Sequence, residues 1–334
     1  MAFRINPLWW PVIVAASPVL VPMLSIKYRR FTENKKRAAL VNQGRIEKAK
    51  PLSLPALKSL ELVVLEEWAT EKGFVGEPGV SYLFRTDQAS LLYDVAFGPD
   101  RGSLAHNAEK LGIDFGHVDA LAISHLHPDH MGGMKAFRAK EKAVLVPEEL
   151  GRPEGKPCFL TGEVKASGFS VELVTEPRML TAGIASIGPL ARGLFFLGYT
   201  EEQALVAKIE GKGLVIITGC GHPTIEVIIE MVGRLSDDPI YAIGGGLHFP
   251  ITSGRGTYEG MPGIQMQMIV GTGKPPWKRI TDDELSSTIK AINAAGPKRV
   301  LLSEHDTCDY SIQRFKHELT AETEVLKAGA TYSL

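Results

Sequence analysis

The sequence predicts an α/β layered fold, with sheets inside and helices outside, preceded by an N-terminal hydrophobic helix. Three observations predict it: strand-forming segments dominate the first half of the body, helical segments gather in the second half, and several predicted strands end in polar residues. The chain has 334 residues, of which 44% are hydrophobic and 22% charged. That composition allows one large α/β domain with a substantial core and an N-terminal appendage.

The first predicted element is an apolar segment from Leu8 to Ile26 that contains no charged residue. At about 1.5 Å per residue it would span roughly 28 Å, close to the hydrocarbon thickness of a bilayer. Trp9 and Trp10 stand at one end and a basic stretch follows the other, as at membrane boundaries. We therefore expect residues 1–30 to form a single-pass membrane anchor, with the catalytic body on the cytoplasmic side.

Three alternatives remain for this segment. It could be a cleaved signal peptide, a helix broken at Pro18 or Pro22 that dips into one leaflet, or a buried helix of a soluble protein. Residues 31–58 are rich in Lys and Arg and predict a basic tether, which favours membrane lipid as a partner. The remainder is acidic, so a nucleic acid is not an expected partner, and no feature identifies a protein partner.

Residues 59–334 are expected to form the catalytic domain. Alternating or continuous apolar runs predict its strands, which we place at 60–69, 79–86, 89–97, 118–124, 205–211, 213–219, 239–248, 298–306 and 323–334. Helical periodicity predicts helices over 103–113, 131–140, 222–235, 282–296 and 310–319. Thr281 and Glu284 form a capping-box pattern at the start of the fourth of these helices. Three cysteines do not make a disulfide framework.

The segment "SHLHPDHMGG" follows an apolar strand and leads into a helix, and it concentrates metal-binding side chains. His125 and His127 are two residues apart, so at a strand end they can reach one ion together, while Asp129 and His130 aim at a neighbouring point. Imidazole and carboxylate donors suit Zn²⁺, Mn²⁺ or Fe²⁺. The following glycines, Gly132 and Gly133, would let the backbone pass close to the ions. A pair of such ions can generate hydroxide near neutral pH.

This segment resembles the signature of the metallo-β-lactamase superfamily, and "LLYDVAF" is similar to an earlier strand of that family. The resemblance implies a four-layer αββα sandwich with a dinuclear site at the sheet edge. It extends to one branch, the dihydropteroate-synthase-like or dihydropterin-ribofuranosylaminobenzene phosphate synthase-like metal-dependent hydrolases, through "TGCGHPTIEVI", "AIGGGLHF" and "LLSEHDTC".

The resemblance implies a role for individual residues. His125 and His127 would bind the first ion, with His222 as their third partner, and Asp129, His130 and His305 would bind the second. Asp94 would orient a ligand histidine, and Asp129 would also handle the proton of the attacking water. Cys220 stands where many members have a bridging carboxylate, so it is either a ligand or a small buried residue. His248 is a candidate for binding metal or substrate, or for supporting the site.

The remaining candidates have simpler interpretations. His106, His117 and His317 are expected on the surface, while Cys158 and Cys308 are expected to pack in the interior. The segment 248–277 is rich in Gly, Pro and Met, and we expect either an irregular crossover or a loop that shapes an apolar entrance. Candidates for binding the phosphate of an anionic substrate are Arg192, Arg255 and Lys274.

These features predict a membrane-tethered, dinuclear metal-dependent hydrolase of a small ester, lactone or phosphoester, with two divalent ions, zinc or else manganese or iron. Three alternatives remain. One is a synthase or transferase acting on a pterin-like phosphorylated substrate, the second is a diiron redox protein, and the third is a metal-binding scaffold that positions a partner at the membrane.

Overall fold

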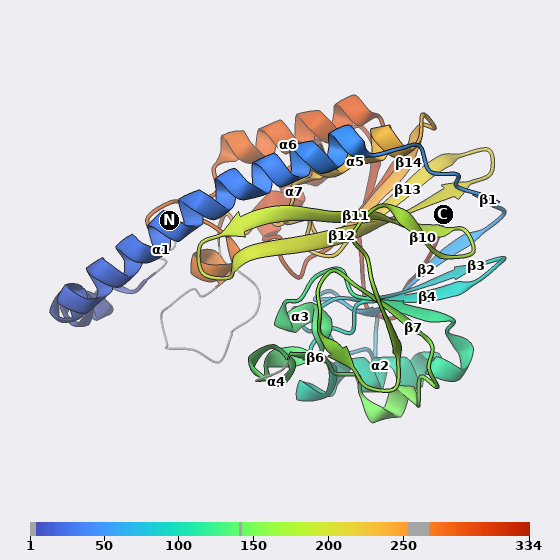
Figure 1. Cartoon of the computed structure of the whole chain (residues 1–334), viewed down its shortest axis with the longest axis horizontal. Coiled ribbons are helices and arrows are strands. Elements are labelled where there is room, and N and C mark those ends of the chain that lie inside the picture. Colours follow the sequence, from blue (N-terminus) through green and yellow to red (C-terminus); the bar gives the residue numbers. More distant parts are fainter. Residues whose placement is uncertain (1–4, 140–141, 253–266) are drawn as a thin grey trace.

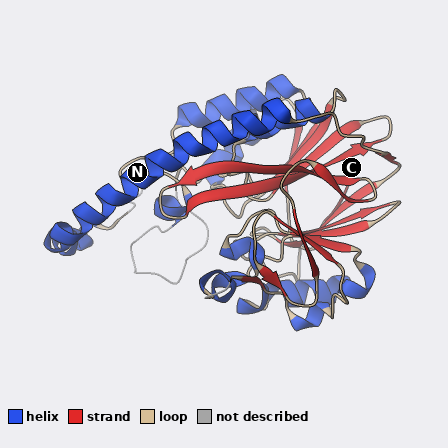
Figure 2. Cartoon of the chain, in the orientation of Figure 1, coloured by secondary structure: helices blue, strands red, loops and turns tan. Residues whose placement is uncertain are grey.

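The computed structural model describes residues 5–139, 142–252 and 267–334 of the chain. Two mixed β-sheets pack face to face, and helices cover the outer face of each, which gives the four-layer αββα sandwich predicted by the resemblance (Figure 1, Figure 2). The predicted apolar helix precedes the sandwich in the chain. The predicted fold class is therefore confirmed.

The first sheet has eight strands in the order β10-β11-β12-β13-β14-β15-β16, with β1 paired to β12. Its strands are β1 (Ala56–Leu57), β10 (Arg178–Thr181), β11 (Ile184–Leu194), β12 (Gly198–Ile209), β13 (Gly213–Thr218), β14 (Ile240–Gly245), β15 (Arg299–Leu302) and β16 (Glu322–Val325). Strands β13 to β16 run parallel, so their carboxyl ends meet at one edge. The long β11–β12 hairpin extends beyond that edge (Figure 1).

The second sheet has seven strands in the order β17-β2-β3-β4-β5-β7-β9. Its strands are β2 (Leu60–Glu66), β3 (Ser81–Thr86), β4 (Ser90–Tyr93), β5 (Ala120–Ala122), β7 (Pro157–Leu160), β9 (Ser170–Leu173) and β17 (Thr331–Ser333). A small separate sheet pairs β6 (Ala143–Val144) with β8 (Lys165–Ala166). The inner faces of the two large sheets share one apolar core, which includes Leu62, Tyr82, Leu205 and Ile217.

Helices cover the two outer faces. On the first sheet lie α5 (Ile225–Leu235), α6 (Asp282–Ala295) and α7 (Asp309–Glu318), and on the second lie α2 (Ser103–Leu111), α3 (Pro128–Met131) and α4 (Gly133–Arg138). The described residues also form short 3-10 helices, η1 (Pro7–Trp9), η2 (Gly98–Asp100), η3 (Phe115–His117) and η4 (Glu148–Leu150), and a π-helix, η5 (Gln267–Gly271). The predicted capping box is present, because Thr281 accepts from the Glu284 backbone N–H and Glu284 caps the Thr281 backbone in return.

The N-terminal segment belongs to one long helix, α1 (Trp10–Lys48). At about 1.5 Å per residue its 39 residues extend about 58 Å. The helix continues through Pro18 and Pro22, so the alternative of a helix broken at these prolines is wrong. Its first part is long and apolar enough to cross a membrane and none of it is buried, features that a signal sequence would share. In Figure 1 this part projects away from the sandwich.

The second part of α1 corrects the expectation of a basic tether over residues 31–58. Residues up to Lys48 are helical and pack on β11, with Phe31, Ala38 and Ile46 buried on the inner side. The Asn42 side chain is buried with them, and its amide both donates to the Ala191 carbonyl (2.9 Å) and accepts from the Ala191 N–H (2.6 Å). The helix therefore satisfies both backbone groups of Ala191, and Arg45 also faces the sheet, where it binds the Pro189 carbonyl and the Glu201 carboxylate.

Candidate metal centre

The predicted histidine cluster follows β5 and forms one side of the site. The chain leaves the sheet at Ala122 and turns into the single-turn helix α3. His125, His127 and His130 are all buried there. The His125 ring centroid lies 4.4 Å from that of His127 and 4.2 Å from that of His130. Three buried imidazoles in so small a space need polar partners, because burying an unpaired polar group is costly.

The opposite sheet supplies those partners from the carboxyl ends of β13 and β15. The loop after β13 carries Cys220 and His222, and the loop after β15 carries His305. His222 Nε2 lies 3.1 Å from His127 Nδ1. Cys220 Sγ lies 3.0 Å from His130 Nε2 and 3.3 Å from His305 Nε2. The fold thus brings the six residues predicted as ligands into one site together with Cys220.

The donor atoms fall into groups whose members all lie within 4.8 Å of one another. The all-histidine group consists of His125, His127 and His222. The mixed group consists of Asp129, His130, Cys220 and His305. A further combination joins Cys220 and His222 with His248. Each of the first two groups has the donor types and the compactness that a divalent transition metal requires.

Hydrogen bonds orient the donor nitrogen of His125. Ser124 Oγ donates its proton to Asp94 Oδ2 (2.7 Å), so the contact of Ser124 Oγ with His125 Nδ1 (2.9 Å) requires the imidazole to donate. The proton therefore lies on Nδ1, and the Nε2 lone pair stays free. That buried Nε2 has no hydrogen-bond partner within the described residues. An unpartnered lone pair beside two other imidazoles fits a bound cation.

The histidines of the mixed group are oriented by carboxylates. His130 Nδ1 lies 2.7 Å from Asp94 Oδ2 and donates to it, which leaves Nε2 directed at Cys220. His305 Nδ1 contacts Ser303 Oγ, and Ser303 Oγ donates to Glu67. In both imidazoles Nδ1 faces the supporting residue and Nε2 faces Cys220. A proton on Nδ1 leaves the Nε2 lone pair free, which is the tautomer that metal binding requires.

The electrostatics differ between the two groups. Burial and the neighbouring imidazoles hold the pKa of His125 and of His222 well below the ordinary value, and burial lowers the pKa of His127 to about 3. These side chains are therefore neutral, as ligands must be. In the mixed group, burial acts to lower the pKa of His130, but Cys220, Asp129 and Asp94 raise it well above the ordinary value. His130 therefore favours its protonated form, whereas burial lowers the pKa of His305, in the same group, to about 4.

One residue that the sequence did not reveal organises the loop after β13. The buried carboxylate of Glu202, on β12, accepts from the backbone N–H groups of Gly219 (3.1 Å), Cys220 (3.1 Å), Gly221 (2.8 Å) and His222 (2.8 Å). The loop holds a member of each donor group, so Glu202 positions both. Little in the sequence indicates this role, because Glu202 lies between Glu201 and Gln203 in a polar stretch that does not predict a buried strand.

Two other interpretations need correction or refinement. A Cβ at Gly132 would lie 2.2 Å from the Leu145 carbonyl oxygen, and one at Gly133 would lie 2.4 Å from an Asp100 carboxylate oxygen. These glycines therefore allow close packing against Leu145 and Asp100 beside the site. His248 lies with its ring centroid 4.6 Å from that of His222, and its Nε2 contacts the Gly271 carbonyl.

The other predicted residues lie outside the centre. The surface holds His106, His117 and His317, and Cys158 and Cys308 are buried without a disulfide. Lys274 pairs with Glu284 at 2.5 Å. Arg192 lies opposite Thr200 in the β11–β12 register, so both side chains leave the same face of the hairpin. Arg255 and residues 253–266 of the segment 248–277, predicted as a crossover or entrance loop, lie outside the described residues.

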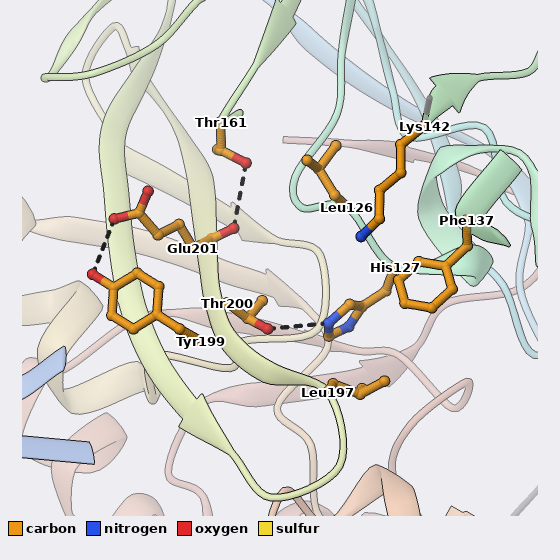
Figure 3. Close-up of a pocket in the computed structure, with 9 residues that line it drawn as sticks. All are labelled: Leu126, His127, Phe137, Lys142, Thr161, Leu197, Tyr199, Thr200 and Glu201. Carbon is orange, nitrogen blue, oxygen red and sulfur yellow. Dashed lines mark hydrogen bonds between the residues drawn. The ribbon is translucent and has the colours of Figure 1, made fainter. Parts of the chain in front are cut away.

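A pocket of about 200 Å³ opens beside the all-histidine group. Figure 3 shows the Thr200 hydroxyl meeting His127 Nε2, a contact of 3.2 Å, with the Lys142 amine pointing toward the same histidine. The pocket is lined by Leu126, His127, Phe137, Lys142, Thr161, Leu197, Tyr199, Thr200 and Glu201. It gives a small molecule access to one edge of the site.

Residues 75–234 match the model of the metallo-β-lactamase superfamily. Among solved structures, Tm1679, described as a metal-dependent hydrolase of the β-lactamase superfamily, aligns with 82% of this chain and 98% of its own, at a TM-score of 0.57 and 22% identity. The metallo-β-lactamase fold protein YhfI from Bacillus subtilis aligns with 83% of this chain and 100% of its own, at a TM-score of 0.47 and 15% identity. The superfamily model matches just under half of the chain, and the similarity to Tm1679 shows that the chain has the metallo-β-lactamase fold.

A curated relative is the 7,8-dihydropterin-6-methyl-4-(β-D-ribofuranosyl)-aminobenzene-5′-phosphate synthase of Methanocaldococcus jannaschii. It is 22% identical to this chain over 294 residues, which cover 77% of this chain and 90% of the relative. This similarity agrees with the branch resemblance noted in the sequence. The fold and the donor groups together describe a protein of the metallo-β-lactamase fold whose residues could hold metal.

Proposed function

We propose that this protein is a membrane-tethered hydrolase that uses two divalent metal ions to cleave an ester, a lactone or a phosphoester. One observation carries the proposal: donor side chains from loops of both sheets converge in two adjacent groups. The all-histidine group and the mixed group would hold one ion each. Imidazole and thiolate donors favour zinc, with manganese and iron as alternatives.

When bound, such ions would lower the pKa of a water molecule and polarise the oxygen of the substrate. The reaction breaks one C–O or P–O bond, adds OH to the acyl or phosphoryl centre and adds H to the leaving oxygen. The chain's own side chains bind and orient the reactants, and the pocket beside His127 admits the substrate.

Asp129 is suited to orient the attacking water. Its side chain is 17% exposed, whereas the other donor residues are nearly inaccessible. Burial acts to raise the pKa of Asp129, but His130, His305 and His127 outweigh it and hold the pKa well below the ordinary range. The carboxylate therefore stays ionised and accepts a hydrogen bond from the water, which holds that water in position for attack.

The helix α1 supports the anchoring part of the proposal. Its apolar part is unburied and is followed by Lys27, Arg29 and Arg30, which the positive-inside rule places on the cytoplasmic side. The sandwich would then lie in the cytoplasm, held at the bilayer surface by the second part of the helix.

Reconstitution tests the proposal directly. The full chain, stripped with a chelator and reloaded with Zn²⁺, Mn²⁺ or Fe²⁺, should hydrolyse at least one probe among p-nitrophenyl acetate, γ-butyrolactone and bis-p-nitrophenyl phosphate. Asp129→Asn should lower that activity by about 10²-fold or more, since the amide replaces the ionised carboxylate that orients the attacking water. No metal-dependent turnover of any of these probes would contradict the hydrolase.

The curated relative favours a second candidate, a synthase or transferase acting on a pterin-like phosphorylated substrate. Arg192, whose side chain leaves the same hairpin face as that of Thr200, could bind the phosphate. Turnover of a dihydropterin diphosphate with an aminobenzene ribosyl phosphate acceptor, without hydrolysis of the ester and phosphoester probes, would support the synthase instead.

A further inference from the structure

The tip of the β11–β12 hairpin meets α1 at the point where its apolar part ends. The Phe195 ring centroid lies 5.8 Å from that of Phe31, and Lys27 Nζ lies 5.6 Å from the Phe196 ring centroid. Lys27 is the first charged residue after the apolar segment that begins at Leu8. The hairpin tip therefore lies at the level where the helix would leave the bilayer (Figure 1).

Other aromatic residues surround this point. Trp277 places its ring centroid 5.7 Å from Tyr28 and 5.6 Å from Phe195, and it is 56% exposed. We name Tyr28, Phe195, Phe196 and Trp277 the aromatic collar. Exposed Trp and Tyr beside basic residues are typical of the membrane–water interface, where the rings lie among the head groups. The collar thus has the composition of a second membrane contact beside the helix.

The same hairpin connects the collar to the site. Leu197, directly after Phe196, lines the pocket, and Thr200 contacts His127 at 3.2 Å. Thr200 follows Phe196 by four positions, so the two residues lie at most about 13 Å apart, the length of four residues of extended chain. The head-group layer of a bilayer is itself roughly 5–8 Å thick. The pocket therefore opens within reach of the membrane surface.

The pocket lining favours an anionic, partly apolar ligand. Leu126, Phe137 and Leu197 contribute apolar surface. The negative charge of Glu201 is balanced by Arg45, whose guanidinium lies 2.7 Å from the carboxylate, whereas the Lys142 amine points into the pocket (Figure 3). A negatively charged head group would therefore be attracted to the pocket.

We propose that the substrate is an anionic amphiphile drawn from the membrane, with a phosphoester head group that enters the pocket and an apolar tail that stays at the collar. This inference rests on the proposed hydrolase and its anchor, and it adds the substrate class and the direction of entry. A bilayer confines such a substrate and the anchored enzyme to one surface, which raises their effective concentration.

Fluorescence tests the collar without requiring activity. In full-length chain reconstituted in phosphatidylcholine–phosphatidylglycerol vesicles, Trp9→Phe, Trp10→Phe and Trp68→Phe leave Trp277 as the single tryptophan. Lipids brominated high on the acyl chain should quench it strongly. The matched control keeps Trp68 alone and should be quenched little. Equal quenching of Trp277 and Trp68 would overturn the membrane contact.

Kinetics in the same vesicles test the substrate class. The probes are two p-nitrophenyl phosphodiesters with the same head group, one with a methyl and one with a hexadecyl tail. The hexadecyl probe should show a kcat/KM higher by roughly ten- to a hundredfold, because it shares the surface with the enzyme. Equal kcat/KM for both probes would overturn the inference and leave the hydrolase intact, whereas no metal-dependent turnover of either probe would overturn both.

A pair of variants separates the collar from general effects on folding. Phe196→Ser with Trp277→Ser should remove most of the preference for the hexadecyl probe while leaving turnover of the methyl probe within about twofold, since neither side chain reaches the donor groups. The control replaces two exposed apolar residues of β9, Val171→Ser with Leu173→Ser, and should keep the preference. A preference that survives the collar variant would contradict the proposed entry.

Discussion

The all-histidine group and the mixed group are neighbours, yet they are supported in different ways. In the all-histidine group both direct contacts are hydroxyls: His125 contacts Ser124, which donates to Asp94, and His127 contacts Thr200. In the mixed group His130 donates directly to the Asp94 carboxylate, whereas Glu67 supports His305 through the Ser303 hydroxyl. A carboxylate behind an imidazole raises its basicity as a ligand, whereas a hydroxyl mainly fixes its orientation.

The difference suggests a division of labour between the two ions. The all-histidine group offers neutral donors, so an ion there would keep its full positive charge and act as the stronger Lewis acid. The mixed group adds Asp129 and Cys220, whose negative charges would balance an ion and hold it more firmly. The predictions below alter one group at a time, in order of decreasing expected effect on catalysis.

His127→Ala should have the largest effect. It removes one of three neutral donors and widens the pocket, so metal in the all-histidine group and activity should be lost together, by more than about 100-fold. Removal of a residue that only orients a metal ligand already lowers metal affinity or activity by about 10–100-fold. Parallel metal analysis and kinetics check this result. A variant that retains both metal and activity would end the dinuclear account.

Cys220→Ser should act on the mixed group. Serine offers a harder, neutral donor, so zinc affinity should fall by about tenfold or more while manganese affinity changes less. With Co²⁺ in place of zinc, a thiolate ligand gives a near-ultraviolet charge-transfer band, and the variant should lack it. If the wild-type cobalt protein already lacks this band, Cys220 is a packing residue and the mixed group contains three donors.

Glu202→Gln should weaken both groups, because the carboxylate holds a loop that carries Cys220 and His222. A glutamine has one acceptor oxygen where the carboxylate uses both, so we expect a loss of about 10–100-fold in metal affinity at both groups. Glu67→Gln is the matched control, because it acts through Ser303 on His305 alone. Equal effects of the two variants on the all-histidine group would contradict this distinction.

Glu66, next to Glu67, supports neither group, and its replacement should change stability and not catalysis. Both carboxyl oxygens lack a hydrogen-bond partner in the described part of the chain, and burial raises the pKa of Glu66 to about 8 from an ordinary 4.5. The folded state thus binds a proton that the unfolded state releases, so stability falls as pH rises from about 4.5 to about 8.

Glu66→Gln removes this proton uptake. It should leave stability nearly unchanged below pH of about 4.5 and raise it by up to roughly 3–5 kcal/mol near pH 8, with a flatter profile between. Denaturant unfolding of the full chain in detergent, measured across this pH range, checks the prediction. A variant profile parallel to that of the wild type would show that Glu66 ionises without cost in the folded state.

Apolar periodicity predicted most strands and helices before residue 140 and after residue 205, and the capping box at Thr281 and Glu284 was correctly predicted. Strands β6 to β11 and the first part of β12 were not predicted. The donor residues could also be predicted from the sequence, because they are clustered or lie at strand ends. Glu202 and Glu67 could not be predicted, because their partners are backbone groups and side chains from distant segments. The packing of α1 on β11 was missed as well, since the basic composition of that helix hides a narrow buried side.

Metal content tests the central claim most directly. Full-length chain purified in detergent without chelators, and analysed for bound transition metals alongside His127→Ala and Cys220→Ser, should contain two divalent ions per chain. Each variant should retain fewer ions, with the loss in His127→Ala accompanied by loss of activity. A wild-type chain without stoichiometric metal, or variants that bind as much metal as the wild type, would contradict the account.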